Sequence, residues 1–156
     1  MRELLLETVT ALLDDYAVGH AFDATIETSE SQLCCVLGFT GDAMTGSVVV
    51  AATADAVAAS NPVPSTGSAM WLAELTNQLV GRFKNQLLRR GVDVSMSVPV
   101  VLSATRLVPI LQRAIAPIRL TVASGDMTVY LEVEGDLTLD LPDESAVLRE
   151  GEALLF

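Results

Sequence analysis

The sequence predicts an α+β domain in which two long helices pack on one face of a mainly antiparallel sheet, forming a sandwich. Three observations lead to this prediction. The chain has 156 residues, 51% of them hydrophobic, which is enough for one domain with a full-sized core. The hydrophobic patterns follow the order helix, strands, helices and strands, and the expected hairpins imply antiparallel pairing. No repeat, low-complexity tract or linker divides the sequence, so we expect a single domain over residues 1–156.

An amphipathic helix is expected over residues 2–15, before the first strands. Its predicted buried face consists of Leu5, Val9, Leu12 and Leu13. Three segments with β character follow it, over residues 21–30, 31–39 and 44–52. Turn-forming residues between them, such as Gly41-Asp42, mark the ends of these strands. A short helix is then expected over residues 53–59, with Thr53 as its N-terminal cap.

The middle of the chain holds the longest helical pattern. Residues 61–67 include two prolines and a glycine, which block regular structure, so this segment is expected to be a loop. A helix is predicted from Ser68 to about Arg90, with Gly91 in the first position beyond its C-cap. The apolar stripe of this helix consists of Leu72, Leu75, Leu79, Val80, Phe83 and Leu87.

The remainder of the chain is expected to be mostly strand. The predicted strands cover residues 92–103, 113–123, 126–134 and 136–141. The second and third of these strands form a hairpin around Gly125-Asp126. Residues 136–156 are expected to be a C-terminal extension of the domain, and its last fifteen residues fit either an edge strand or a tail.

The charge balance excludes several kinds of partner. Nine basic and 20 acidic residues give a net charge of −11 and a pI near 4.3. Binding to nucleic acid or to an anionic membrane surface needs clustered Lys and Arg, so neither is expected. The N-terminal segment is acidic throughout and lacks the apolar run of a signal peptide, and no apolar stretch is long enough to span a membrane. We therefore expect a cytoplasmic protein.

The cysteine and histidine counts exclude further chemistries. His20 is the one histidine, and Cys34 and Cys35 are adjacent, so the ligands for a structural zinc site are too few and wrongly spaced. Neighbouring residues of a strand point to opposite faces, which would strain a disulfide between these two cysteines. Both thiols are therefore expected to be reduced, and no metal site is expected.

The opposite face of the long helix is polar. It consists of Glu74, Asn77, Gln78, Gly81, Lys84 and Asn85. Glu74 and Asn77 are three residues apart, so their side chains stand about one turn from each other. Gly81 lies in the middle of this face, although glycine within an exposed helix costs on the order of 1 kcal/mol relative to alanine. Close approach of another molecule would explain this glycine, whereas periodicity alone favours an ordinary solvated face.

Recognisable motif residues occur on this polar face. Glu74-Leu-Thr-Asn77, followed by Gly81 and Lys84, resembles the phosphatase helix of the CheC/CheX/FliY family of bacterial chemotaxis phosphatases. A proline some two dozen residues later, Pro99, also fits, as does the order of the predicted elements over roughly residues 1–134. Because the chain has one Glu-x-x-Asn helix, it is most similar to the CheX type.

The resemblance implies a function. Members of the family dephosphorylate the phospho-aspartate of a CheY-like response-regulator receiver domain. By this resemblance Asn77 and Glu74 are the catalytic residues, where the Asn77 amide orients the attacking water and Glu74 pairs with a lysine of the receiver. The residues expected to contact the partner are Gln78, Gly81, Lys84 and Asn85. The resemblance further implies a homodimer and no cofactor of its own, because the receiver supplies the Mg²⁺.

Two alternatives remain open at this point. The chain could be a catalytically inactive CheX-like interaction domain that binds a receiver or a flagellar or chemotaxis component. Met70 favours this alternative, because the family often has Asp or Ser at that position, and so does the unassigned C-terminal segment. The chain could also be a purely structural homo-oligomer whose β-rich second half pairs edge to edge across a two-fold axis.

Overall fold

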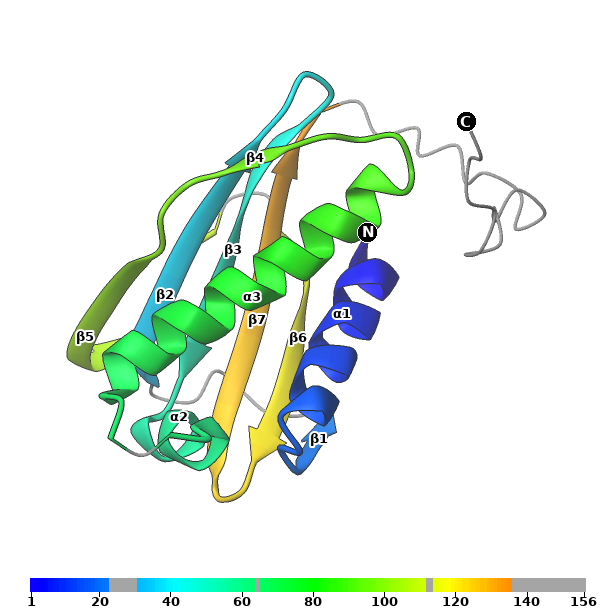
Figure 1. Ribbon diagram of the computed structural model, residues 1–156. Helices are drawn as coiled ribbons and strands as arrows, with labels where there is room; N and C mark the ends of the chain where they lie inside the picture. Colours follow the sequence, from blue (N-terminus) through cyan, green and yellow to red (C-terminus); the bar gives the residue numbers. More distant parts are fainter. Residues whose placement is uncertain (23–30, 64, 112–113, 136–156) are drawn as a thin grey trace.

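Seven strands form one antiparallel sheet in the computed structural model, which describes residues 1–22, 31–63, 65–111 and 114–135 (Figure 1). Within these ranges the elements are α1 (Arg2–Asp15), β1 (His20–Phe22), β2 (Ser31–Thr40), β3 (Thr45–Ala52), α2 (Ala54–Ser60), α3 (Ser68–Leu88), β4 (Ser95–Met96), β5 (Val100–Leu107), β6 (Ala114–Val122) and β7 (Gly125–Glu134). The strand order is β1-β6-β7-β3-β2-β4, and β5 also pairs with β2.

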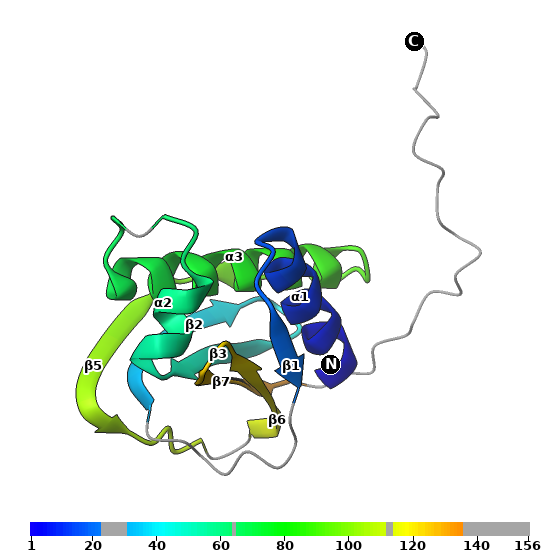
Figure 2. The same cartoon turned by 90° about the horizontal axis from the view of Figure 1, so that it is seen from below.

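The three helices described lie on the same side of the sheet (Figure 2). The longest helix, α3, packs over β2 and β3, and α1 lies beside it against β6. The predicted apolar stripe of α3 faces the sheet, because all six of its members are buried. Since aliphatic side chains of both layers fill the space between them, the α+β sandwich predicted from the sequence is confirmed.

The adjacent cysteines of β2 point to opposite faces of the sheet, as predicted. Cys35 belongs to the main core beneath the helices, whereas Cys34 packs on the other face with Val49, Ala51 and Tyr130. Both thiols are free and buried. The alternation of a pleated strand is the cause of this separation, and it prevents the two sulfur atoms from meeting.

Two helices end in the same type of turn with different residues. After α3, Gly91 has a φ of +78°, and the N–H of Val92 donates to the Leu87 carbonyl at 3.0 Å. This is the Schellman arrangement predicted for Gly91. After α1, Ala17 takes the equivalent position with a φ of +53°, and the N–H of Val18 donates to the Leu13 carbonyl at 2.9 Å. An alanine therefore adopts a left-handed conformation that favours glycine.

Two of the predicted boundaries are wrong. Residues 92–103 do not form a continuous strand, because β4 and β5 are separated by a break that contains Pro99. Proline has no backbone N–H to donate, so the ladder along β2 is interrupted there. The hairpin turn lies at residues 123–124, and Gly125 pairs with Val122 as the first residue of β7.

Gly125 is needed for packing rather than for the turn. A Cβ at this position would collide with the backbone nitrogen of Ala56 and with Oγ1 of Thr53. Thr53 caps α2 as predicted, because its Oγ1 accepts from the N–H of Ala56 at 3.3 Å and from the N–H of Asp126 at 3.1 Å. The glycine therefore allows α2 to approach the start of β7.

Some predictions concern residues outside the described part of the chain. They include the strand over residues 136–141, the C-terminal extension 136–156 and most of the strand over residues 21–30, of which β1 covers the beginning. None of the helices within the described ranges combines the length and the hydrophobicity that crossing a membrane requires.

Candidate functional site

The sequence-predicted site residues all lie on α3, on the side turned away from the sheet. Figure 1 views α3 from this outward side. The side chains of Glu74, Asn77 and Asn85 are exposed, and Gln78, Gly81 and Lys84 are half-buried. The helix places them together because the residues between them supply the buried stripe. The fold thus converts a sequence pattern into one continuous surface, which we call the α3 ridge.

Asn77 presents a free amide at the centre of this ridge. Its side chain is exposed, and no described residue forms a hydrogen bond with it. An amide offers one acceptor and two donor hydrogens, so it can orient a water molecule without adding negative charge. The neighbouring Thr76 is fully buried and donates to the Leu72 carbonyl of the same helix at 2.8 Å. The amide therefore projects from a turn of α3 whose opposite side is packed in the core.

Glu74 lies one turn before Asn77 and is held by a neighbouring side chain. Nε2 of Gln78 donates to Oε1 of Glu74 at 2.7 Å, a pair that is four residues apart on the helix. The hydroxyl of Tyr16, from the end of α1, donates to Oε1 of Gln78 at 2.7 Å. Gln78 was predicted to contact the partner, and that role stays a prediction. In the structure its amide joins Glu74 to Tyr16.

Gly81 has no internal reason to be glycine. A Cβ at this position would meet no atom within 4 Å outside the local helix backbone. The backbone of Gly81 is also within the helix and does not have a positive φ. Neither packing within the described part of the chain nor backbone conformation therefore requires glycine here.

An exposed apolar side chain lies at each end of the ridge, and of these two Met70, but not Leu88, was considered from the sequence. Met70 is 71% exposed and Leu88 is 52% exposed. They are eleven residues before and seven after Gly81, spacings that place all three on one side of a helix. That spacing was visible in the sequence, but Leu88 was counted with neither face. The ridge is thus a polar centre with an apolar residue at each end, an arrangement suited to a protein partner.

The cations near the ridge are held to different extents. Lys84 lies 3.9 Å from a carboxylate oxygen of Asp93, at the limit of an ion pair, so its ammonium can turn toward a partner. Nη1 of Arg82 contacts Oδ2 of Asp15 at 2.7 Å and joins α3 to α1. Lys84 is therefore better suited than Arg82 to an intermolecular contact.

The two thiols do not supply a nucleophile. Burial, followed by the neighbouring Cys35, raises the pKa of Cys34 to about 11. Burial also raises the pKa of Cys35, against a smaller lowering effect of a hydrogen bond with Thr76. Because the thiolate is the reactive form, both side chains are unreactive at neutral pH.

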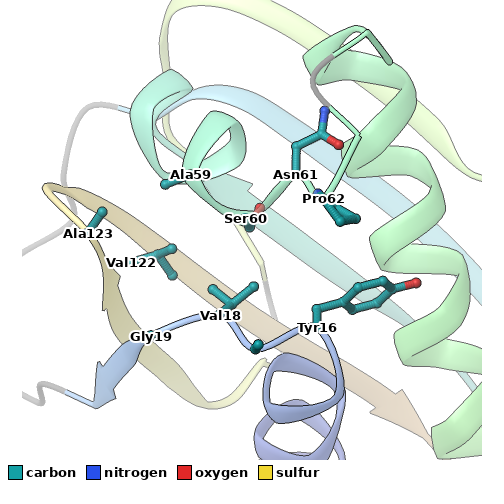
Figure 3. A pocket seen from close by; sticks show the side chains of 10 residues that line it. Tyr16, Val18, Gly19, Ala59, Ser60, Asn61, Pro62, Val122 and Ala123 are labelled. Carbon is teal, nitrogen blue, oxygen red and sulfur yellow. The ribbon is translucent and has the colours of Figure 1, made fainter.

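A cavity of about 290 Å³ lies between the end of α1, the end of α2 and the turn after β6 (Figure 3). Its lining includes Tyr16, Val18, Ser60, Asn61, Val122 and Ala123. The lining side chains are neutral and mostly small, so they offer neither a carboxylate pair nor a metal-ligand set. Tyr16 connects the wall of this cavity to the α3 ridge through its hydrogen bond to Gln78.

Solved chemotaxis proteins share this fold, although no model of a protein family and no curated protein matches the sequence. A chemotaxis protein CheX from Vibrio vulnificus aligns with a TM-score of 0.72 at 16% identity, covering 84% of this chain and 97% of the other. A CheX from Desulfovibrio desulfuricans gives 0.67 at 18% identity, over 85% and 97%. A CheX–CheY–BeF₃–Mg²⁺ complex from Borrelia burgdorferi gives 0.65 at 13% identity, over 85% and 96%. The chain thus has the fold of the CheC/CheX/FliY family.

Proposed function

We propose that this chain is a CheX-like phosphatase that hydrolyses the phospho-aspartate of a CheY-like receiver domain. The observation that carries the proposal is the pairing of Glu74 and Asn77, one turn apart on an exposed helix face with Gly81 at its centre. The sequence motif Glu74-Leu-Thr-Asn77 points to the same pair. The fold likeness to CheX supports it, and so does the solved complex in which a CheX relative is bound to CheY.

In the proposed reaction a water oxygen attacks the phosphorus of the receiver's acyl phosphate. The bond between phosphorus and the aspartate oxygen breaks, so that the products are the aspartate carboxylate, inorganic phosphate and a proton. The exposed amide of Asn77 would hold the water in line with the breaking bond. An acyl phosphate is already reactive, so positioning is the main contribution that the phosphatase has to make. The Mg²⁺ belongs to the receiver substrate.

Glu74 would fix the docked receiver by an ion pair with a lysine of that domain. Gln78 engages Oε1 of this carboxylate, and no described residue contacts Oε2 by a hydrogen bond or an ion pair. The chain carries a net charge of −11, so long-range attraction to an acidic receiver is not expected. Local pairs made by Glu74 and Lys84 would therefore decide the register, with Gly81 and Asn85 contributing close contact.

The deciding experiment is the decay of a phosphorylated receiver domain with and without this protein. We expect the wild type to accelerate the decay and Asn77→Ala to abolish the acceleration while leaving the thermal stability unchanged. Gln86→Ala is the matched control, because it removes a side-chain amide from the same helix. This amide bonds to Arg90. An Asn77→Ala variant with the wild-type rate would refute the catalytic assignment.

A second candidate is a receiver-binding domain without catalytic activity. It is favoured by the exposed Met70, which stands where the family often has Asp or Ser. The same decay assay separates the two candidates when it is combined with a binding measurement. Binding to the phosphorylated receiver without any acceleration of its decay would support the second candidate and exclude the first.

We also infer a homodimer formed through β5. Val98, Val100 and Leu102 alternate along this segment and are 78%, 54% and 48% exposed. Strand β5 pairs with β2, and no other described strand pairs with it. An exposed apolar edge strand favours pairing with a second copy across a two-fold axis.

This dimer can be tested by light scattering. We expect a dimer for the wild type and a monomer for Val100→Lys. Val108→Lys alters an equally exposed valine that lies just beyond β5, so it should leave the dimer intact. A monomeric wild type at tens of micromolar, or a dimer in all three proteins, would contradict the assignment of the interface to β5.

A further inference from the structure

We propose that Tyr16 and Gln78 are positioning residues that hold Glu74 in the conformation needed for docking. The inference rests on the proposed function, because it concerns the efficiency of the Glu74 contact with the receiver. Tyr16 and Gln78 are 62 residues apart in the sequence and come from different helices. Neither is assigned to touch the phosphoryl group. Tyr16 is also not among the residues expected to contact the receiver, so its effect must pass through Gln78 and Glu74.

The hydrogen bonds run in one direction along this chain of side chains. A carboxylate only accepts, so the Gln78 group facing Glu74 must be the NH₂, at a distance of 2.7 Å. The carbonyl oxygen of Gln78 then faces α1, where it accepts from the Tyr16 hydroxyl at 2.7 Å. A turned-over amide would place its carbonyl oxygen against the carboxylate and lose the bond to Glu74, whereas the Tyr16 hydroxyl could still accept from the NH₂ group. The carboxylate therefore sets which way the Gln78 amide faces, and the bond to Tyr16 holds that amide in place beside Glu74.

Tyr16 is anchored in turn by the core. Its ring meets the ring of Trp71 edge to face, with centroids 5.1 Å apart and an interplanar angle of 88°. Trp71 is buried and donates from Nε1 to Oγ of Ser60 at 2.9 Å, and Ser60 donates to the Val57 carbonyl at 2.9 Å. The position of Glu74 therefore depends on a series of contacts that begins at α2 and the core. The series passes through Tyr16 at the end of α1 and ends at Gln78 on the α3 ridge.

The Tyr16 side chain borders the cavity. Figure 3 shows the Tyr16 ring extending from the end of α1 toward α3, at the margin of the space lined by Val18 and Ser60. The ring also packs against the core. The contact with Trp71 and the bond to Gln78 are the interactions that keep the hydroxyl in place.

Preorganisation of Glu74 should lower the cost of docking. Ordering a long, exposed side chain on binding costs about 0.5–1.5 kcal/mol, which corresponds to roughly two- to tenfold in affinity. The hydrogen bonds already order the Glu74 side chain in the free protein, so this cost does not arise again on docking. Loss of the Tyr16 hydroxyl should therefore raise KM for the phosphorylated receiver about fivefold and leave kcat unchanged.

The test is a double-mutant cycle between Tyr16→Phe and Glu74→Ala. Tyr16→Phe keeps the ring and its contact with Trp71, so the fold should be retained, as a thermal unfolding measurement checks. We expect the roughly fivefold rise in KM in the wild-type background and no further rise in the Glu74→Ala background. Arg82→Gln is the control, because it breaks the other polar link between α1 and α3 without touching Glu74. KM of this control should stay at the wild-type value.

Three results would overturn the inference: no change of KM in Tyr16→Phe, an equal rise in both backgrounds, or the same rise in Arg82→Gln. These outcomes differ from a failure of the proposed function, in which the wild type does not accelerate the decay of the phosphorylated receiver. In that case the same cycle is measured on the dissociation constant of the receiver, and additivity of the two substitutions again overturns the inference.

Discussion

Gly81 provides a test in which stability and docking should change in opposite directions. In Gly81→Ala a methyl group is added at the centre of the α3 ridge, where it meets no atom of the described residues within 4 Å apart from the chain neighbours and the local helix backbone. The substitution therefore removes the helix cost of glycine, about 1 kcal/mol, without creating a clash. For a domain of this size, that gain corresponds to a rise in Tm of about 2–4 °C.

The same methyl group should impair docking. If the receiver approaches the helix backbone at Gly81, the methyl occupies space that belongs to the partner, and overpacking of this kind costs about 1–3 kcal/mol. KM for dephosphorylation should then rise about fivefold or more, since 1.4 kcal/mol corresponds to a factor of ten. The assays are thermal unfolding of the free protein and the dependence of the decay rate on receiver concentration.

Thermal unfolding tests the predicted gain in stability, and KM separately tests the predicted loss of docking. A more stable variant with an unchanged KM would refute close approach at Gly81, whereas a less stable variant would refute the conclusion that the chain itself tolerates a side chain there. Gln86→Ala serves as the reference, because it changes a residue of the same helix outside the ridge and should leave KM unaltered.

Further predictions concern the scaffold. Ala17→Gly should raise the free energy of unfolding by about 1 kcal/mol in a urea titration, because Ala17 has a φ of +53°, and a loss of stability would contradict the left-handed assignment. Phe83→Ala should cost about 3–5 kcal/mol in the same titration, since Phe83 is 1% exposed; a loss below 1 kcal/mol would mean that the helix packs differently. The raised pKa of Cys34, about 11, lies above the value of about 8.5 for an unfolded thiol. Between these pH values the folded state binds more protons, so stability should fall with rising pH by up to about 1.4 kcal/mol per unit and less steeply in Cys34→Ala; equal slopes in the two proteins would contradict the burial of this thiol.

Local signals predicted the helices of this fold well. The spacing of the apolar residues of α3 identified its buried face, and Gly91 and Thr53 marked a helix end and a helix start that the hydrogen bonds confirm. These features depend on residues within one or two turns of each other, so the sequence displays them directly. The α3 ridge could be predicted for the same reason, because one helix carries all of it.

Features that depend on distant contacts were not predictable. The bond between Tyr16 and Gln78 depends on how α1 packs on α3, and the need for glycine at position 125 depends on the approach of α2. Ala17 adopts a left-handed conformation although it is not glycine, so the sequence carries no signal for this turn. The break at Pro99 was overlooked because the residues on both sides pair with β2, so the apolar pattern continues across it.

Because the contact that supports Glu74 comes from outside α3, this helix could not be transplanted alone with the same side-chain arrangement. A peptide or designed scaffold carrying only residues 68–88 would present Glu74, Gln78 and Asn77, but it would lack the Tyr16 hydroxyl that holds the Gln78 amide in place. A scaffold that reproduces the position of Glu74 would therefore require a second helix that places a tyrosine opposite Gln78. Under the proposed function, substitutions at position 16 would adjust receiver affinity while every residue of the motif stays unaltered.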